Sequence, residues 1–318
     1  MTDLSIIIVT YKGWSKLEKC LESVKSFSGS DFSFEVIIVD NSPDPGEIDP
    51  LKDKFPGFSY LHNPVNGGYA NGTNLGSRKA SGNFLLILNP DTVASAEAVS
   101  LLLKGARENG FTINSCRQVN SRGKESIMSG SFPEFRTLTG FMRAFSSRKK
   151  ESGRRDILFP DWVSGSVILV SKDDFTRLNG FDEDFWMYYE DVDLCQRARD
   201  SGGKVAVFKD VIIEHNHGGS SRISTSVTSM TKTEVLISRH IYMCKHRKGL
   251  AGFLIQSFMV VNNLITNLIT GIPGLLFFFV PKLFVRTLIL GRLVSYYCGA
   301  AVKSTWVSPR SVNYRKYA

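Results

Sequence analysis

The chain has 318 residues, of which 42% are apolar and 22% charged, and its net charge is +9. This composition is typical of one large folded domain, or of one domain with an appendage, and it excludes a disordered chain. The five cysteines are scattered without a CxxC pair, which argues against a disulfide framework and a zinc site and suits a reducing cytosol. Because the N-terminus carries an acid where a signal peptide needs basic residues, we expect no export signal.

The charge is unevenly distributed along the chain. Residues 222–318 hold thirteen Lys and Arg against the single acid Glu234, a balance of +12, which leaves residues 1–221 at −3. This asymmetry predicts a basic module that faces an anionic partner, either nucleic acid or a membrane surface. Since the same region is strongly apolar, the membrane is favoured.

The first part of the chain alternates between buried strands and amphipathic helices. Apolar, β-branched runs predict strands at 4–10, 34–39, 58–61 and 84–88, and apolar residues at helical spacing predict helices at 14–27 and 94–108. The strand–helix–strand order predicts right-handed crossovers and a mostly parallel sheet. Ligands of such sheets bind beyond the carboxyl ends of the strands, where Thr10, Tyr11 and Asp40 lie.

Two segments that follow strands suggest phosphate and metal binding. Residues 63–76 are rich in Gly and Asn and predict a loop and helix start close to a phosphate or sugar, although an ordinary tight loop fits equally well. Neither a P-loop nor a dinucleotide fingerprint is present. Asp91 follows the fourth strand, where it either ligates a hard divalent cation bridging to a diphosphate or only caps the next helix.

The middle of the chain is less regular. For residues 111–160 we expect loops with a short apolar element at 138–145, which border an acceptor pocket or rest against lipid. A strand at 167–170 and a helix at 171–178 follow. Strands at 205–208 and 211–213 then lead to His215, His217 and a Gly-Gly-Ser-Ser loop, where a histidine suits a metal, a phosphate or both.

The most distinctive stretch is GFDEDFWMYYEDVDL, residues 180–194, which places six carboxylates among five aromatic rings. The rings favour burial and carry the acids into a pocket, where burial raises a carboxylate pKa and a nearby cation lowers it. Glu190 and Asp191 are therefore candidates for a general base. The alternative is that either residue merely caps the helix that follows.

These motifs occur in the order typical of a known family. The segments are VTYKGWSKLEKCLESV, IIVDNS, NGGYANGTNLG, LILNPD, WVSGSVILVS, LNGFDEDFWMYYEDVDLCQR and HNHGGSS. Together they resemble family 2 inverting glycosyltransferases, in particular bacterial rhamnosyltransferases that act on polyprenyl-diphosphate-linked sugars, and the resemblance covers roughly residues 4–247. It implies the GT-A fold, an α/β, Rossmann-like fold with a mixed, mostly parallel sheet and flanking helices.

The resemblance also implies roles for matching residues. The nucleotide and sugar would be held by Thr10, Tyr11, Asp40, Asn66, Gly68, Asn74 and Asn89. Asp191, paired with Glu190, matches the catalytic base. Asp91 matches the last acid of the DxD motif that binds Mg²⁺ or Mn²⁺, and His215 or its neighbour His217 matches the histidine that helps the metal hold the diphosphate. Further possible site residues are Trp162 and Gly165.

One departure and one expected absence accompany this resemblance. Asn89 stands where many relatives carry the first Asp of DxD, which implies a thinner metal site. Inverting transfer needs a base for the acceptor hydroxyl and positive charge on the departing diphosphate, but no covalent intermediate. Accordingly we expect no catalytic Ser or Cys, and the sequence contains no nucleophile elbow.

The C-terminal region predicts a membrane-associating module. Residues 249–281 contain no charged residue, a run longer than the roughly 20 residues of a spanning helix. One helix face carries Gln256, Asn263, Asn267 and Thr270, and residues 271–274 are expected to break the helix. These features favour a peripheral or re-entrant interfacial helix over a spanning helix or a buried hairpin. The flanking basic residues and aromatic rings suit a headgroup layer.

We therefore predict a GT-A catalytic domain at 1–221, a helical connection at 222–248 and membrane-associating helices at 249–318. The expected activity is metal-dependent transfer of L-rhamnose from dTDP-L-rhamnose to a polyprenyl-diphosphate-linked saccharide in bacterial cell-surface polysaccharide synthesis. The expected location is the cytoplasmic face of the inner membrane.

Several alternatives stay open. The donor could instead be UDP-galactofuranose, UDP-glucose or UDP-GlcNAc, or the chain could be a catalytically silent, nucleotide-sugar-binding scaffold subunit. Pairing with a second copy is open because apolar helices could form a homodimer. Nucleic acid is not an expected partner, since long apolar runs separate the basic residues.

Overall fold

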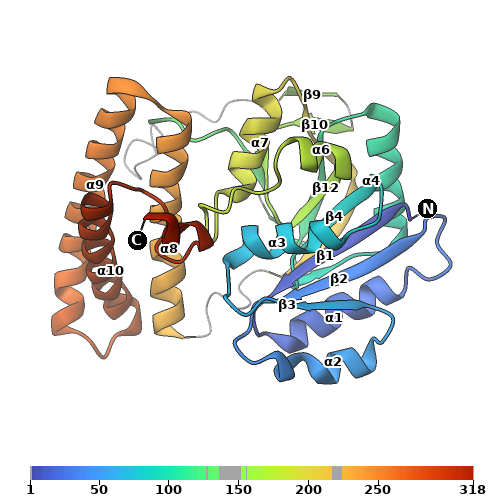
Figure 1. The fold of residues 1–318 in the computed structure, drawn as a ribbon, viewed down its shortest axis with the longest axis horizontal. Coiled ribbons are helices and arrows are strands. Elements are labelled where there is room, and N and C mark those ends of the chain that lie inside the picture. The colour runs from blue at the N-terminus through green and yellow to red at the C-terminus, as the bar shows by residue number, and fades with distance from the viewer. Residues whose placement is uncertain (1, 127, 136–151, 155, 217–223, 318) are drawn as a thin grey trace. The chain divides into compact units, whose positions relative to one another are not determined.

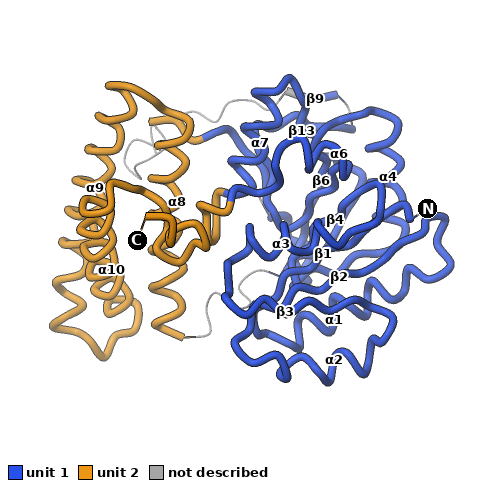
Figure 2. Tube along the Cα trace, viewed as in Figure 1, with its two compact units in different colours: residues 1–132, 149–182, 190–219 blue, residues 133–148, 183–189, 220–318 orange. Residues whose placement is uncertain are grey.

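The structure, a computed structural model, describes residues 2–126, 128–135, 152–154, 156–216 and 224–317. They fall into two compact units, one drawn from residues 1–132, 149–182 and 190–219 and the other from 133–148, 183–189 and 220–318 (Figure 2). The short apolar element predicted at 138–145 and the site residue His217 lie outside the described residues. Each unit is described by itself.

The first unit alternates strands and helices. Its strands are β1 (Leu4–Thr10), β2 (Phe34–Asp40), β3 (Ser59–His62), β4 (Phe84–Leu88), β5 (Thr92–Val93), β6 (Ile113–Val119), β7 (Glu125–Ser126), β8 (Ser129–Gly130), β9 (Ser152–Gly153), β10 (Ile157–Phe159), β11 (Trp162–Val163), β12 (Val167–Ser171) and β13 (Val205–His215). Its helices are α1 (Trp14–Lys25), η1 (Pro45–Ile48), α2 (Asp49–Lys54), α3 (Gly68–Lys79), α4 (Ala96–Asn109), α6 (Lys172–Arg177) and α7 (Glu190–Asp200).

The main sheet is mixed and runs in the order β3-β2-β1-β4-β12-β6-β13-β10-β9. The pairs β3–β2, β2–β1, β1–β4 and β6–β13 are parallel, whereas β12 runs antiparallel to both β4 and β6. The predicted mixed sheet with flanking helices is therefore confirmed. Because β12 reverses direction, its N-terminal end lies beside the carboxyl ends of β4 and β6, which is where the site is found.

Helices cover both faces of this sheet (Figure 1). On one face Ile6 and Ile8 of β1 pack in one apolar cluster with residues of α1 and α4. On the other, Ile7 and Val9 share a second cluster with residues of α3, α6 and α7. This two-sided burial explains why β1 is a continuous apolar run rather than an alternating one.

The glycine-rich segment is mostly helix, although the sequence predicts a loop and helix start. Helix α3 begins at Gly68, and a Cβ added at Gly72 or Gly76 would lie 2.7 Å from Val9 Cγ1 or 2.6 Å from Ile7 Cγ2. These glycines therefore allow α3 to pack closely on β1. The two strands predicted at 205–208 and 211–213 form one strand, β13, with a register irregularity between Phe208 and Ile212.

The second unit is helical. Its helices are α8 (Thr225–His246), α9 (Gly249–Leu276), α10 (Pro281–Lys303) and the short η4 (Val312–Tyr317). The predicted helix break at 271–274 is wrong, because α9 continues to Leu276 with Pro273 inside it. A side chain at Gly274 would clash with the carbonyl oxygen of Leu283, so this glycine serves close packing against α10 rather than a break.

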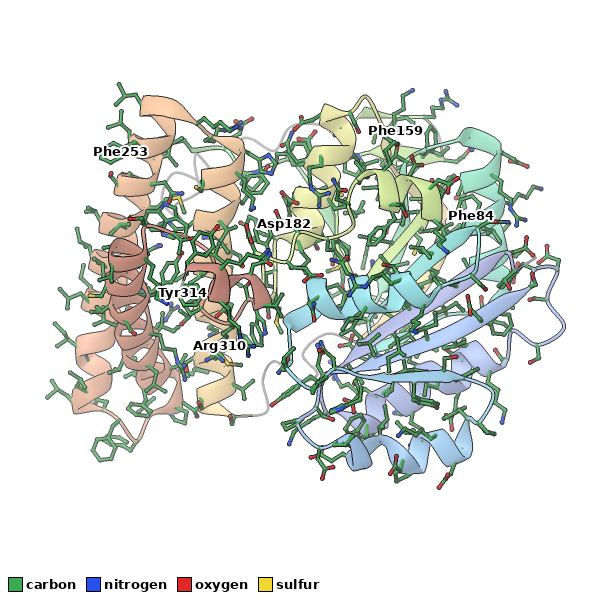
Figure 3. All side chains as sticks on the ribbon, in the orientation of Figure 1. Phe84, Phe159, Asp182, Phe253, Arg310 and Tyr314 are labelled. Atoms are coloured by element: carbon green, nitrogen blue, oxygen red, sulfur yellow. The ribbon has the colours of Figure 1, made fainter. Side chains whose placement is uncertain are left out.

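The polar stripe of α9 points into its own unit. Gln256, Asn263 and Asn267 are buried, with Gln256 Nε2 donating to the His240 carbonyl oxygen at 2.7 Å and Asn263 Nδ2 donating to the Tyr297 hydroxyl at 3.0 Å. The outward face is apolar instead: Phe253 is 68% exposed and Ile269 67%. Figure 3 shows Phe253 on the outer side of this helix. By length and composition α9 would be able to cross a membrane.

Candidate active site

The carboxyl ends of the first three parallel strands present polar side chains in register. Thr10 pairs with Asp40, and Asp40 pairs with His62. Asp40 is buried, and its two carboxylate oxygens accept from the Ser42 N–H at 2.8 Å and the Ser42 hydroxyl at 2.7 Å. The expected nucleotide-binding carboxylate is thus held rigidly at the sheet edge, with Tyr11 partly exposed beside Thr10.

The glycine-rich segment supplies a helix start and a clamp. Asn66, two residues before α3, and Gly68, its first residue, take positive φ angles of 42° and 83°. Asn74, further along α3, donates from Nδ2 to the Phe181 carbonyl oxygen at 2.8 Å and accepts the Phe181 N–H at Oδ1 at 3.0 Å. Asn74 therefore fixes the start of the acidic stretch.

Glu190 and Asp191 are the first two residues of α7. Tyr188 and Tyr189, just before them, have φ angles of 71° and 68°, a conformation that costs a non-glycine residue energy and is concentrated at functional sites. Asp191 Oδ2 accepts the Gly165 N–H at 2.7 Å, and Oδ1 accepts the Val192 N–H at 2.8 Å. These hydrogen bonds fix the orientation of the carboxylate.

Burial raises the pKa of both acids, but their surroundings differ. For Asp191, hydrogen bonds from the Gly165 and Val192 N–H groups oppose the effect of burial on the pKa. For Glu190, burial and then the charge of Asp191 raise the pKa well above its usual value, and Glu190 Oε2 has no hydrogen-bond partner in the described chain. Asp191 therefore ionises first, while Glu190 keeps its proton to higher pH.

Tyr69, which sequence reasoning missed, lies among the carboxylates. Its hydroxyl donates to the Gly165 carbonyl oxygen at 2.6 Å. Burial raises the pKa of Tyr69 well above its usual value, and the charges of Glu190, Asp191 and Asp91 add to the rise. A Cβ at Gly165 would lie 3.2 Å from the Tyr69 ring and 3.6 Å from Asp191, so a side chain here would crowd Tyr69.

Asp91 and His215 come together because β5 pairs with the end of β13. His215 Nε2 lies 3.2 Å from Asp91 Oδ1, and His215 Nδ1 lies 2.8 Å from Gln118 Oε1. Since an amide oxygen only accepts, His215 Nδ1 donates to Gln118 Oε1, and Nε2 is the ring nitrogen that faces Asp91. The pair therefore offers one nitrogen and one oxygen ligand to a cation.

These ligands fit a cation whose coordination is completed by substrate phosphates and water. The described residues contain no group of three His, Cys, Asp or Glu that could hold a metal alone. Mg²⁺ typically binds through one or two carboxylates together with substrate phosphates and water. Asn89, two residues before Asp91, has no hydrogen-bond partner for its side chain within the described ranges and would be available to a ligand.

The base and the Asp91–His215 pair are joined through β6 and β12. The Asn89 N–H donates to the Ser166 carbonyl oxygen at 3.0 Å, and the Ser166 hydroxyl donates to Gln118 Oε1 at 2.8 Å. Ser166 directly follows Gly165, which holds Asp191. Sequence reasoning missed both residues: Gln118 lies in none of the quoted motifs, and Ser166 lies in WVSGSVILVS without an assigned role.

Two other acids of the stretch, Asp184 and Asp193, form ion pairs. Asp193 pairs with Arg197 at 2.7 Å, and Arg197 also donates to the carbonyl oxygens of Leu178 and Gly180. Asp184 belongs to the second unit, where it pairs with Lys245 at 2.5 Å. Trp162 lies on the small β8–β11 sheet, with its indole N–H donating to the Ser131 carbonyl oxygen at 2.9 Å.

Comparisons with known proteins cover the same region. Residues 5–158 match the model for glycosyl transferase family 2, and residues 159–218 match a model described as the N-terminal domain of galactosyltransferase. The chain is 28% identical over 210 residues to the rhamnosyltransferase WbbL of Escherichia coli, covering 62% of this chain and 77% of that protein. It is 26% identical over 231 residues to the N-acetylglucosaminyl-diphospho-decaprenol L-rhamnosyltransferase of Mycobacterium tuberculosis, covering 64% and 72%.

A solved structure supports the fold. GalNAc-T7 with UDP, GalNAc and Mn²⁺ aligns with a TM-score of 0.52 at 15% identity, covering 73% of this chain and 48% of that one. At this identity the likeness concerns the fold alone, a GT-A fold. The two family models together span residues 5–218, and two relatives are named rhamnosyltransferases. This chain belongs to the family 2 glycosyltransferases with a GT-A fold and is close to rhamnosyltransferases.

Proposed function

We propose that this enzyme transfers L-rhamnose from dTDP-L-rhamnose, with inversion, to a polyprenyl-diphosphate-linked saccharide during synthesis of a bacterial cell-surface polysaccharide. The observation that carries the proposal is the fixed Asp191 carboxylate, joined through Gly165, Ser166 and Gln118 to the Asp91–His215 pair. The names of two relatives support the sugar, and one of them includes a diphospho-decaprenol acceptor.

Asp191 acts as the general base. An inverting transfer requires one carboxylate to take the proton from the acceptor hydroxyl as its oxygen attacks the anomeric carbon. Both Asp191 oxygens already accept a backbone N–H, which favours the ionised form and fixes its direction. Glu190, which stays protonated to higher pH, is a positioning residue beside it.

Asp91 and His215 would hold Mg²⁺ or Mn²⁺, with Asn89 beside them. When bound, the cation supplies positive charge to the departing nucleoside diphosphate. Gln118 fixes the orientation of the His215 ring by accepting a hydrogen bond from Nδ1, as residues that contact metal ligands commonly do. Thr10, Tyr11 and Asp40 would hold the base and ribose, and Asn66 and Gly68 would approach the phosphates at the start of α3.

The second unit attaches the enzyme peripherally to the cytoplasmic face of the membrane. Two features support this: the exposed apolar face of α9, and the apolar turn at Phe277, Phe278 and Phe279, each at least 47% exposed. The exposed Lys282 and Arg286 follow this turn, where cations favour anionic headgroups. The same apolar face could instead bind a second copy of the chain and form a homodimer.

A donor screen tests the proposed function. Purified protein is given dTDP-rhamnose and a set of UDP- and GDP-sugars, with and without Mn²⁺ or Mg²⁺, and membrane lipid extract as acceptor; nucleoside diphosphate release is measured. We expect metal-dependent turnover of dTDP-rhamnose alone. Turnover of UDP-galactofuranose, UDP-glucose or UDP-GlcNAc would discard the rhamnose assignment, and binding without turnover of any donor would favour a silent scaffold subunit.

A further inference from the structure

A pocket of about 570 Å³ lies within the second unit, where α8 ends and α9 begins. Its walls are largely apolar and include Phe253, Val260, Val261 and Trp306, and two cations, Arg247 and Lys248, line it as well. The volume falls in the range of roughly 300 to 1,000 Å³ typical of small-ligand sites. The mechanism proposed above does not use this pocket.

Neither cation has an anionic partner among the residues that the structure describes. Arg247 and Lys248 are exposed, and no described carboxylate lies within salt-bridge distance of either. Uncompensated cations beside an apolar cavity suit an amphiphile whose charged end is anionic. A free phosphate would leave the apolar walls unused, and an uncharged lipid would leave the cations unused.

The pocket is continuous with the exposed apolar face of α9. Phe253 and Val261 line the pocket and are 68% and 55% exposed. A hydrocarbon chain seated against them therefore leaves along the same apolar surface that we assign to the membrane. This arrangement allows a lipid to bind while most of its tail stays in the bilayer.

Helix α8, whose last residues lie at the pocket, also contacts part of the acidic stretch. Lys245, one residue before the end of α8, pairs with Asp184 at 2.5 Å. Ser238 donates to the Met187 carbonyl oxygen at 2.9 Å, and Arg239 Nε donates to the Tyr189 hydroxyl at 3.1 Å. Helix α8 thus fixes the segment that leads directly into Glu190 and Asp191.

We propose that this pocket binds the prenyl diphosphate end of the acceptor, with Arg247 and Lys248 contacting the diphosphate and the apolar walls contacting the first isoprenoid carbons. The proposal rests on the proposed function, because it takes the acceptor to be a polyprenyl-diphosphate saccharide. The contacts between α8 and residues 184–189 favour the acceptor over a bulk phospholipid, since α8 ends at the pocket and this segment leads directly into Glu190 and Asp191.

Binding of farnesyl diphosphate to the full-length protein tests the pocket. The double variant Arg247→Glu/Lys248→Glu should bind this probe at least about tenfold more weakly, because two charge-assisted contacts become repulsive. The matched control, Lys232→Glu/Lys316→Glu, changes the net charge equally at exposed positions outside the pocket and should bind as the wild type does. Val260→Trp, which fills the cavity without changing charge, should also weaken binding.

Kinetics and competition separate this proposal from the proposed function. With the saccharide diphosphate on an undecaprenyl chain, the Arg247/Lys248 variant should raise the acceptor KM about tenfold and leave the nucleotide-sugar KM unchanged. Equal farnesyl diphosphate affinities in all variants, or displacement of the probe by phosphatidylglycerol vesicles at equal lipid concentration, would overturn the pocket assignment. Such a result would not affect the donor screen, which tests the proposed function. Conversely, failure of the donor screen would not change the measured affinity for farnesyl diphosphate.

Discussion

Asparagine in place of Asp191 should abolish transfer while leaving the fold and donor binding intact. General base catalysis contributes typically 10²- to 10⁴-fold, or about 3 to 5 kcal/mol of the activation free energy. Asparagine has one acceptor oxygen, so it keeps only one of the two hydrogen bonds from Gly165 and Val192. The lost bond costs about 1 to 3 kcal/mol of stability, which is offset in part because a buried charge is removed.

Glu190→Gln is the matched control for this experiment. Glutamine imitates the protonated glutamic acid, the state in which burial and the Asp191 charge hold this residue. The variant should therefore keep transfer within about tenfold of the wild type, far above Asp191→Asn. It should also leave the acid limb of the kcat/KM profile unmoved, because that limb reports ionisation of Asp191, whose pKa burial raises above 3.8.

The assay is release of nucleoside diphosphate and formation of the glycosyl product, measured across a pH series at saturating donor. Thermal unfolding and donor titration on the same samples show whether each variant is folded and binds nucleotide sugar. Two results would refute the assignment of the base. One is Glu190→Gln that is as inactive as Asp191→Asn, and the other is Asp191→Asn that retains near-wild-type turnover.

Three other predictions concern separate parts of the chain. Gln118→Leu removes the acceptor that fixes His215 Nδ1, so the Mn²⁺ concentration for half-maximal activity should rise about 10- to 100-fold at unchanged donor KM; an unchanged metal requirement would contradict this role. Burial raises the pKa of Glu234 from 4.5 to about 7, so its contribution to the free energy of unfolding is present below pH 4.5 and lost as pH rises through about 7. Glu234→Gln should therefore remove about 3 kcal/mol of the pH dependence of the free energy of unfolding, measured by denaturant. Equal pH dependence in wild type and variant would refute this prediction. Phe278→Ser with Phe279→Ser should weaken sedimentation with anionic vesicles, whereas unchanged pelleting would argue against insertion of this turn.

The strands buried on both faces could be predicted from the sequence, whereas one central strand could not. β1, β2 and β4 are apolar runs, and their burial produces a clear signal. β6 is buried as well, yet it carries Asn114, Ser115 and Gln118. Their polar atoms are satisfied across the sheet, as when the Ser115 hydroxyl donates to the Val167 carbonyl oxygen at 2.7 Å. Hydropathy alone cannot distinguish such a strand from a loop.

Some residues of the candidate site could likewise be predicted from the sequence, and others could not. Asp91, Asp191 and His215 stand in recognisable motifs, so their candidacy follows from sequence. Tyr69 and Gln118 act through partners 96 and 97 residues away, Gly165 and His215. No local pattern encodes those contacts, because they exist only once α3, β6 and β13 are folded around β12.

The buried stripe of α9 shows what an amphipathic pattern leaves undetermined. A periodic polar face can point to water or to a polar partner, and only packing decides. Here burial lowers the pKa of His240 to about 4, so the neutral ring faces Gln256 Oε1 at 2.5 Å and the Tyr297 hydroxyl at 3.0 Å, and the polar face is satisfied inside the unit. On the remaining face Leu250 is 74% and Phe253 68% exposed, and no polar side chain of the described segments covers them. Contiguous apolar surface of this kind marks a protein or membrane contact, so the inward stripe strengthens the case for lipid against α9.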